Sequence, residues 1–241
     1  MSNITNQLNA LESSLKDLDL SDMLLKIADQ FPAQVVFSTS FGMEDQVVTE
    51  AIASSGAFIS IFTLDTGRLF DETYSVWAET IRRYPIRIKA YTPDASTLNE
   101  WLEKEGPNAF YASVENRKTC CRIRKVEPLK KALQGFKIWI TGIRAEQSLH
   151  REAIPMLEWD EASSIIKFHP LVSWTESDVR NHLKEHEVPY NPLHDQGFVS
   201  IGCSPCTRAI QPGQDFRAGR WWWEDNSKKE CGLHTHGSHK L

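Results

Sequence analysis

Hydrophobic and polar positions along the chain follow two periods, one typical of buried strands and one typical of amphipathic helices. Short runs rich in β-branched residues predict four strands, at 34–38, 58–63, 86–91 and 137–141. A fifth run, from Ile165 to Pro170, predicts an element at the edge of the sheet. Helical spacing predicts helices at 44–55, 71–83, 96–105 and 121–134. Because strands and helices alternate, we predict an α/β fold with a parallel sheet and right-handed crossovers.

Two further helical segments flank this alternation. Leucines at helical spacing, ended by Pro32, predict an N-terminal helical segment over 1–30. Near the other end, Thr175 is predicted to cap a helix over 175–186. Asp178 stands three residues later, in place of the usual Glu or Gln of a capping box.

From Pro189 onward the helical and strand periods end, and Pro, Gly, Cys, Arg and Trp crowd together. We therefore expect one α/β domain over 1–241, with a nucleotide-binding core at 34–188 and an irregular C-terminal region at 189–241. In parallel sheets of this kind a ligand binds at the carboxyl ends of the strands.

Composition narrows the classes of function. The chain has 241 residues and a formal net charge of −5, so it lacks the basic excess of a nucleic-acid-binding protein. No apolar run reaches the roughly 18–20 residues that span a bilayer, and no signal-peptide pattern opens the chain. We expect a cytoplasmic protein with neither a membrane nor a nucleic-acid partner. In a reducing compartment its five Cys are expected to be metal ligands, catalytic thiols or core residues rather than a disulfide scaffold.

Three loops follow predicted strands and carry Gly or hydroxyl residues: 38–45, 63–67 and 141–144. A loop of this kind before a helix offers backbone N–H groups and the helix dipole to an anion. One such loop alone is an ordinary turn, but three at one sheet edge favour a nucleotide site. The loops match neither the dinucleotide-binding motif nor a P-loop.

Four cysteines form two pairs, the adjacent Cys120 and Cys121 and the C-x-x-C pair of Cys203 and Cys206. Four thiolates can hold zinc or a [4Fe–4S] cluster, and each Cys can also be a small buried core residue. Adjacent side chains point about 100° apart on a helix, which makes sharing one zinc ion awkward. A cluster with separate irons accommodates them more easily, so we favour iron–sulfur.

The fifth cysteine, Cys231, stands near the C-terminus, after Lys228 and Lys229 and before His234. Basic neighbours lower the pKa of a thiol and favour a nucleophilic thiolate. The alternative is a free thiol on a frayed tail.

Four segments together resemble a known family: Cys120-Cys121, 202–207, 219–224 and 229–234. The chain from about 34 to 234 is similar to the assimilatory adenylyl-sulfate reductases, within the wider phosphoadenylyl-sulfate reductase family. The resemblance implies an adenine-nucleotide alpha-hydrolase-like, Rossmann-like fold. It also implies a [4Fe–4S] cluster on the two cysteine pairs, thioredoxin or glutaredoxin as electron donor, and often a homo-oligomer.

The resemblance further implies a reaction in sulfate assimilation and cysteine biosynthesis. The Cys231 thiolate would attack the sulfur of adenylyl sulfate, AMP would leave, and a thiosulfonate would remain on the enzyme. A donor thiolate would then free sulfite by thiol exchange. A thiol that must meet both a substrate and an outside protein is expected to sit on a mobile tail.

The resemblance and the loops together give the expected site residues. Cys231, His234 and Lys125 are expected to be catalytic. The expected substrate-binding residues are Ser38, Ser40, Phe41, Gly42, Leu64, Asp65, Gly142, Arg144, Arg151, Arg217 and Arg220. Attack of a thiolate on an anionic sulfate needs positive charge nearby, which the basic members of this set supply. The alternative for Arg217 and Arg220 is a pair of solvated surface charges.

The 3′ position of the nucleotide decides between substrates. The loop 38–45 carries Glu44 and Asp45 but no Lys or Arg, which disfavours a second phosphate and favours adenylyl sulfate. A phosphoadenylyl-sulfate reductase or a member that accepts both substrates stays open. A tRNA-thiolation enzyme would need an SGG-x-DS loop, which is absent here, and a zinc-stabilised binding module would leave Cys231 unexplained.

Overall fold

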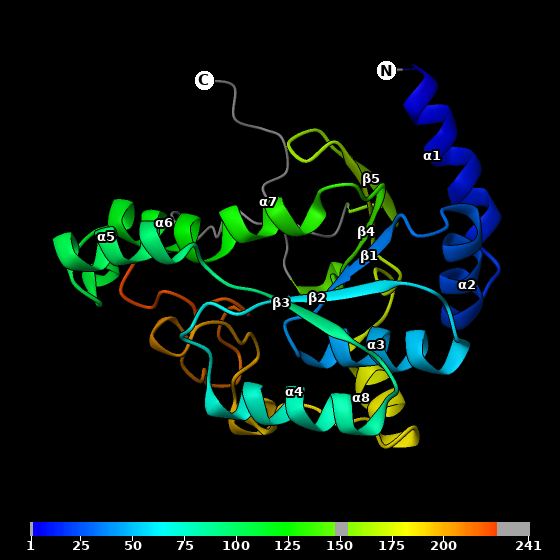
Figure 1. Cartoon of the computed structure of the whole chain (residues 1–241). Helices are drawn as coiled ribbons and strands as arrows, with labels where there is room; N and C mark the ends of the chain where they lie inside the picture. The colour runs from blue at the N-terminus through cyan, green and yellow to red at the C-terminus, as the bar shows by residue number, and fades with distance from the viewer. Residues whose placement is uncertain (1, 148–153, 226–241) are drawn as a thin grey trace. The chain divides into compact units, whose positions relative to one another are not determined.

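A computed structural model describes residues 2–147 and 154–225 of the chain (Figure 1). The chain forms two compact units, each made of three segments. Unit 1 comprises Met1–Phe62, Ser75–Lys89 and Gly135–Asn191, and unit 2 comprises Thr63–Tyr74, Ala90–Gln134 and Pro192–Leu241. The single domain expected over 1–241 stays a prediction.

A six-stranded sheet organises the fold. Its strands are β1 Val35–Ser38, β2 Ser60–Leu64, β3 Ile88–Tyr91, β4 Ile138–Ile140, β5 Leu157–Asp160 and β6 Ile165–Phe168. Their order across the sheet is β3-β2-β1-β4-β6-β5. β1 pairs in parallel with β2 and β4, β4 pairs in parallel with β6, and only β5 is shown pairing antiparallel, with β6. The predicted α/β fold with a mostly parallel sheet is confirmed.

Eight α-helices accompany the sheet in the described part of the chain. They are α1 Ser2–Leu15, α2 Leu20–Gln30, α3 Met43–Ser55, α4 Asp71–Arg83, α5 Ala95–Glu105, α6 Val114–Cys121, α7 Glu127–Leu133 and α8 Glu176–Glu185. A π-helical turn, Arg122–Val126, joins α6 to α7, so this helical run begins seven residues before the predicted helix over 121–134. Among the described residues, no helix combines the length and the apolar character needed to cross a bilayer.

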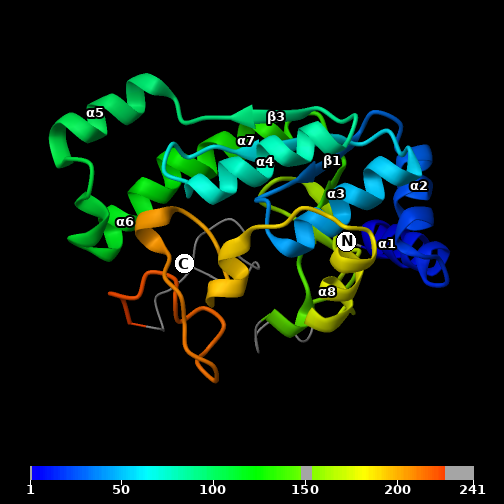
Figure 2. The same cartoon turned by 90° about the horizontal axis from the view of Figure 1, so that it is seen from below.

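The core of unit 1 forms around β1 and the helices near it. Val35, Val36 and Phe37 are all fully buried, as expected for a central parallel strand covered on both faces. α3 and α8 lie side by side beneath the sheet in Figure 1, and Figure 2 shows the same pair from below. Each large apolar side chain buried in this way stabilises the fold by about 1.5–3 kcal/mol.

The sequence predicted an element at the edge of the sheet over 165–170, and this placement at the edge is wrong. β6 pairs on both sides, with β4 and with β5, and the edge strand is β5, which the sequence pattern did not predict. The reason lies in the charges of β5. Its Glu158 and Asp160 both pair with Lys167 of β6, whose side chain is only 2% exposed. Two of the four residues of β5 are acidic, so this short segment has no continuous β-branched run like those of the predicted strands.

The predicted cap of α8 is confirmed. Thr175 Oγ1 accepts a hydrogen bond from the Asp178 backbone N–H, at 3.1 Å. The Asp178 carboxylate in turn accepts one from the Thr175 backbone N–H, at 2.8 Å. Asp therefore serves here as the third residue of a capping box.

Candidate active site

In unit 1, the loop after β1 turns sharply into the N-terminus of α3. Phe41 has a φ of 61°, in the left-handed region, and Gly42 is the N-cap of α3. The backbone N–H and the hydroxyl of Ser40 both donate to one carboxylate oxygen of Asp45, at 2.6 Å each. The predicted anion-binding loop therefore already binds an anionic oxygen, one supplied by its own helix.

The Asp45 carboxyl is unusual in its acidity. Burial is the main cause that raises its pKa, to about 6; the hydrogen bonds from Ser40 act against this rise, and the neighbouring Glu44 adds to it. A carboxyl in this state is partly protonated near neutral pH. Another anion can therefore displace this carboxyl from the Ser40 N–H and hydroxyl. The electrostatic cost of doing so is smaller than for an Asp of ordinary pKa.

The loop after β4 packs directly on this turn. A Cβ atom at Gly142 would overlap the Asp45 carboxylate, so this position admits only glycine. Arg144 is buried, and its guanidinium donates to Glu44 at 2.9 Å and to Glu146 at 2.6 Å. Glu44 also accepts from the side chain of Gln147. The guanidinium of Arg144 therefore ties the two loops together in this state of the molecule.

Ser38, the remaining member of the set predicted in unit 1, lies at the carboxyl end of β1. Its hydroxyl accepts a hydrogen bond from the indole N–H of Trp139, at 2.8 Å. Ser38, Ser40, Phe41, Gly42, Gly142 and Arg144 thus all lie in or beside the two loops that follow β1 and β4. Their part in substrate binding stays a prediction.

In unit 2, the two cysteine pairs meet. Cys120 and Cys121 end α6, Cys203 is the N-cap of a short 3-10 turn that contains Pro205, and Cys206 is the last residue of that turn. All four line one cavity, and all four are free thiols. Cys120, Cys203 and Cys206 are buried. The structure therefore brings together the four residues that were predicted to bind metal.

The cavity is unfavourable for four separate thiolates. Burial raises the pKa of Cys120, with Cys203 adding to the effect. Burial, and after it the neighbouring Cys203, likewise raise the pKa of Cys206 to about 12. Buried thiols whose pKa is raised, as for Cys120 and Cys206, are typical of a soft-ligand site that loses its protons when a cation binds.

Basic side chains border the same cavity. Lys125 and Arg124, from the π-helical turn, line it together with Arg68. Arg124 is buried and donates through Nη1 to the backbone carbonyl of Thr66, at 2.6 Å. The Thr66 hydroxyl lies 3.3 Å from Cys203 Sγ.

Two arginine side chains of unit 2 have buried N–H groups that are available for a further hydrogen bond. Within the part of the chain that the structure describes, Nε of Arg124 and Nε of Arg220 make no hydrogen bond. Arg124 lowers the pKa of Cys120, and Arg220 lowers that of Cys206, so both lie near the cysteines. Buried donors of this kind fit an anionic group in the cavity.

The predicted Arg217 and Arg220 meet at one aromatic ring. The guanidinium carbon of Arg220 lies 4.9 Å from the Trp221 ring centroid, and that of Arg217 lies 5.7 Å from it. Arg117 is a third cation on this ring, at 4.6 Å. Trp221 is buried, and the Arg220 guanidinium packs so closely on Gly202 that a Cβ there would displace it. Arg220 is therefore not a solvated surface charge.

The predicted pair Leu64 and Asp65 ends β2 in unit 2. Asp65 accepts hydrogen bonds from the Gly67 backbone N–H, at 2.9 Å, and from the Tyr74 hydroxyl, at 2.7 Å. Burial and then Asp65 raise the pKa of Tyr74 to about 12, so this phenol stays a hydrogen-bond donor. The turn after β2 is thus fixed by its own side chains.

Comparison with known proteins assigns the chain to a family. Residues 34–209 match the phosphoadenosine phosphosulfate reductase domain, which covers more than half of the chain. The chain belongs to this family. The resemblance predicted from the cysteine pairs and the C-terminal segments is confirmed.

Relatives of high similarity within this family have names that specify a substrate. The chain is 52% identical to the adenosine 5′-phosphosulfate reductase of Allochromatium vinosum over 200 residues, covering 83% of this chain and 78% of the relative. It is 46% identical to the enzyme of the same name from Agrobacterium fabrum over 229 residues, covering 95% and 88% of the two chains.

Solved structures agree with the fold. The phosphoadenylyl-sulfate reductase of Candida auris, solved as a phosphate complex, superposes with a TM-score of 0.72 at 27% identity, covering 84% of this chain and 96% of that one. The FMN adenylyltransferase of Candida glabrata superposes with a TM-score of 0.54 at 16% identity, covering 81% and 64%, and shows the fold alone.

Three residues expected at the reductase site lie outside the described residues: Arg151, Cys231 and His234. Their roles stay predictions. Conversely, several residues at the cysteine cavity were not predicted, among them Arg124 and Arg68, which line it, and Thr66, which contacts Cys203. Arg124 stands four residues after Cys120, the spacing that separates Lys125 from Cys121, so the sequence held a signal for it. Nothing in the sequence indicated Thr66.

Proposed function

We propose that this protein is an adenylyl-sulfate reductase, which converts adenosine 5′-phosphosulfate to sulfite and AMP with a protein dithiol as reductant. One observation carries the proposal: two cysteine pairs, more than 80 residues apart in sequence, line a single cavity with Lys125 and Arg124. The membership of the family and the names of its similar members support the same substrate.

The four cysteines fit a [4Fe–4S] cluster. Cys120, Cys121, Cys203 and Cys206 would each supply one thiolate. The basic side chains around the cavity, and the spare N–H groups near the sulfurs, would offset the negative charge of a thiolate-bound cluster. When bound, the cluster would anchor the two cysteine-bearing segments and add negative charge beside the cations of the site.

The proposed nucleophile is the Cys231 thiolate. It attacks the sulfur of adenylyl sulfate, the bond from sulfur to the phosphate oxygen breaks, and AMP leaves with that electron pair. The enzyme then carries a Cys–S–SO3⁻ thiosulfonate. A thiolate of thioredoxin or glutaredoxin attacks Cys231 Sγ and sulfite leaves, after which the donor's second thiol releases Cys231 as a thiolate. The donor dithiol supplies both electrons and becomes a disulfide.

The residues of this chain contribute mainly charge to the reaction. Lys125, Arg217 and Arg220 offset the negative charge of the sulfate as an anionic thiolate approaches it. His234 and Arg151 are proposed to support the thiol and the substrate. Because AMP is a good leaving group, charge compensation rather than acid catalysis is the main task of the site.

The loops of unit 1 are proposed to bind the nucleotide. The Ser40 N–H and the N-terminus of α3 suit the α-phosphate, which would displace the Asp45 carboxylate from its donors. In this region the buried Arg144 is already neutralised by Glu44 and Glu146. Among the described residues of these two loops, Arg144 is the only Lys or Arg, so a 3′-phosphate would find no spare cation there, which supports adenylyl sulfate over its phosphorylated relative.

An anaerobic assay tests the proposal. The protein is purified without oxygen, its iron and sulfide are measured, and sulfite release is followed with reduced thioredoxin or glutaredoxin. We expect a brown protein that prefers adenylyl sulfate to phosphoadenylyl sulfate, and a Cys231→Ser variant that keeps the cluster but releases no sulfite. Cys203→Ser should lose cluster and activity together. A colourless zinc protein without sulfite release contradicts the proposal.

A further inference from the structure

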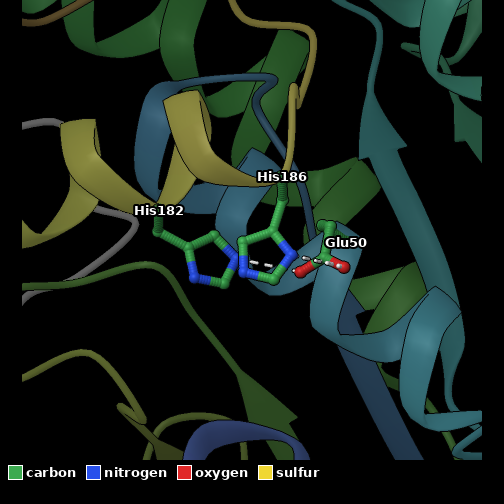
Figure 3. Close-up of side chains that lie close together, drawn as sticks. All are labelled: Glu50, His182 and His186. Carbon is green, nitrogen blue, oxygen red and sulfur yellow. Dashed lines mark hydrogen bonds and ion pairs between the residues drawn. The ribbon is translucent and has the colours of Figure 1, made fainter.

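A second group of metal-ligating side chains lies in unit 1, formed by residues that the proposed reaction does not use. Figure 3 shows Glu50 of α3 facing His182 of α8 and His186, the C-cap residue that directly follows α8. One ligand atom from each lies within 4.8 Å of the others. Nε2 of His182 lies 2.9 Å from Glu50 Oε2, and Nδ1 of His186 lies 3.8 Å from Glu50 Oε1.

The two imidazoles are placed by helical spacing. His182 and His186 are four residues apart, so both project from one face of the helix. Their rings stack with centroids 4.2 Å apart and planes 21° apart, and in Figure 3 both rings extend toward the carboxylate of Glu50. Two histidines at this spacing on one helix, with a third ligand from elsewhere, form a common zinc-binding arrangement.

Contacts from outside the group hold each ligand. Ser54 donates a hydrogen bond to Oε1 of Glu50. Arg83 donates to the backbone carbonyl of His186, at 2.8 Å, which fixes the chain where α8 ends. The Trp174 ring lies 5.7 Å from that of His182. Ligands held in this way are typical of metal sites, where supporting contacts orient the ligand side chains.

Burial and charge also suit a cation. Glu50 is 8% exposed, whereas the side chains of His182 and His186 are 17% and 43% exposed. The carboxylate is thus held inside while one side of the group opens to solvent, from which an ion can enter. One carboxylate with two neutral imidazoles gives a net charge of −1, which attracts a divalent cation.

We propose that Glu50, His182 and His186 bind one Zn²⁺ ion, with water completing its coordination. Two His and one Glu are a known zinc ligand set, whereas Mg²⁺ and Ca²⁺ prefer sites made of oxygen. Zinc bonds of about 2.0–2.2 Å in tetrahedral geometry place neighbouring ligand atoms roughly 3.3 Å apart. The separations of 2.9 and 3.8 Å run to different oxygens of Glu50, and one ligand atom from each of the three residues lies within 4.8 Å of the others, so a modest side-chain shift brings them to this spacing. The ion would join α3 to α8 and stabilise unit 1.

Zinc titration of the full-length, anaerobically purified protein tests this site. Bound zinc is measured by equilibrium dialysis and elemental analysis, and thermal unfolding is recorded with and without Zn²⁺. Glu50→Gln and His182→Ala remove ligands, whereas a His236→Ala/His239→Ala double variant removes only histidines of the C-terminal segment. Iron content, measured before and after dialysis, distinguishes zinc at this site from zinc on the cysteines.

We expect the unchanged protein and the His236/His239 control to bind one Zn²⁺ that raises the unfolding temperature. Glu50→Gln and His182→Ala should weaken this binding by more than the roughly 10–100-fold typical of losing a supporting contact. If His182→Ala fails to fold, His186→Gln, at the more exposed position, decides the question. Equal zinc binding and an equal thermal shift in all variants overturn the proposal, and so does the absence of stoichiometric binding in the unchanged protein.

Discussion

The hydroxyl of Thr66 lies 3.3 Å from the Sγ atom of Cys203, within hydrogen-bonding distance for sulfur. Both groups are buried, and the backbone carbonyl of Thr66 accepts from Arg124. Thr66 therefore links a cysteine of the cavity to a guanidinium beside it. A thiolate of a bound cluster would receive the hydroxyl proton as a hydrogen bond.

Replacing Thr66 by Val is expected to weaken cluster retention without unfolding the protein. Val keeps the shape of Thr but loses the hydroxyl, and a hydrogen bond to a charged acceptor contributes about 1.5–3 kcal/mol. Iron content and the rate of cluster loss in air measure the effect, and both should change several-fold. Thr66→Ser, which keeps the hydroxyl, serves as the control. Equal retention in the Val and Ser variants contradicts the expectation.

Lys125 is expected to matter for chemistry more than for the cluster. It lines the cysteine cavity, and it lowers the pKa of Cys206 against the dominant effect of burial, which places its charge near the sulfurs. Lys125→Ala should reduce kcat/KM for adenylyl sulfate by about 10²-fold or more, the usual effect of losing one charge-stabilising donor.

Iron content separates this effect from damage to the cluster site. Lys125→Ala should keep its iron, and Lys125→Arg should recover part of the activity. Lys130→Ala, at an exposed position of α7 where the side chain pairs with Glu127, is the matched control and should stay active. Loss of iron together with activity in Lys125→Ala would assign the residue a structural role instead.

The Arg117–Glu224 ion pair is expected to hold unit 2 together. Nη2 of Arg117 lies 2.8 Å from Glu224 Oε2, and the two side chains are only 1% and 3% exposed. Arg117→Met leaves a buried carboxylate without its partner, which should cost about 3–5 kcal/mol of unfolding free energy. Chemical denaturation measures this loss.

A double variant, and a single variant at an exposed ion pair, test whether burial of the Arg117–Glu224 pair causes this loss of stability. Arg117→Met/Glu224→Leu removes both charges and should recover much of the stability, because no lone buried charge remains. Arg180→Ala breaks the exposed pair with Glu176 and should cost at most about 1 kcal/mol. If Arg117→Met and Arg180→Ala cost the same, burial of the Arg117–Glu224 pair is not the cause.

Thr175 offers a test of the cap on α8. Its hydroxyl accepts from the Asp178 backbone N–H, and it is solvent-exposed, so few other contacts complicate a substitution. Thr175→Ala should cost about 1 kcal/mol of unfolding free energy, within the usual 0.5–2 kcal/mol for a lost N-cap. Thr175→Ser should be close to neutral, and an Ala variant as stable as the Ser variant would show that the cap contributes nothing.

The same cap illustrates how far the sequence predicts this fold. α8 and its capping box were predictable because Thr175, Asp178 and the helix they start lie within a few residues of one another. α6 was not predicted over 114–120, because its buried positions include Arg117, whose partner Glu224 is 107 residues away. Local patterns indicate the helices and strands that stabilise themselves, and they miss those that depend on a distant charge.

The site follows the same rule. The four cysteines were predictable as one group from their chemistry and their resemblance to a family, and they do line one cavity. The position of Thr66 at the cavity was not predictable, because it depends on the contact between the Thr66 hydroxyl and Cys203. Cys203 stands 137 residues later in the sequence. Arg144 was predicted by its place after a strand, but only the structure shows its pairing with Glu44.

Asp45 is expected to give unfolding a distinct pH dependence. Burial raises its pKa to about 6 in the folded protein, from 3.8 for an ordinary Asp. The folded state then binds the proton more tightly than the unfolded state. The stabilising effect of protonation is fully present below pH 3.8 and is lost as pH rises through about 6, by roughly 3 kcal/mol in all. About half of that loss falls above pH 5.

Asp45→Asn removes the titration while its amide oxygen can still accept from Ser40. The unfolding free energies of the two proteins are compared by urea denaturation from pH 5 to pH 7.5. The unchanged protein should lose about 1–2 kcal/mol relative to Asp45→Asn over this range, because only its carboxyl must ionise within the fold. Parallel pH curves would mean that the Asp45 carboxyl is already ionised at pH 5, and that Ser40 holds it as a permanent anion.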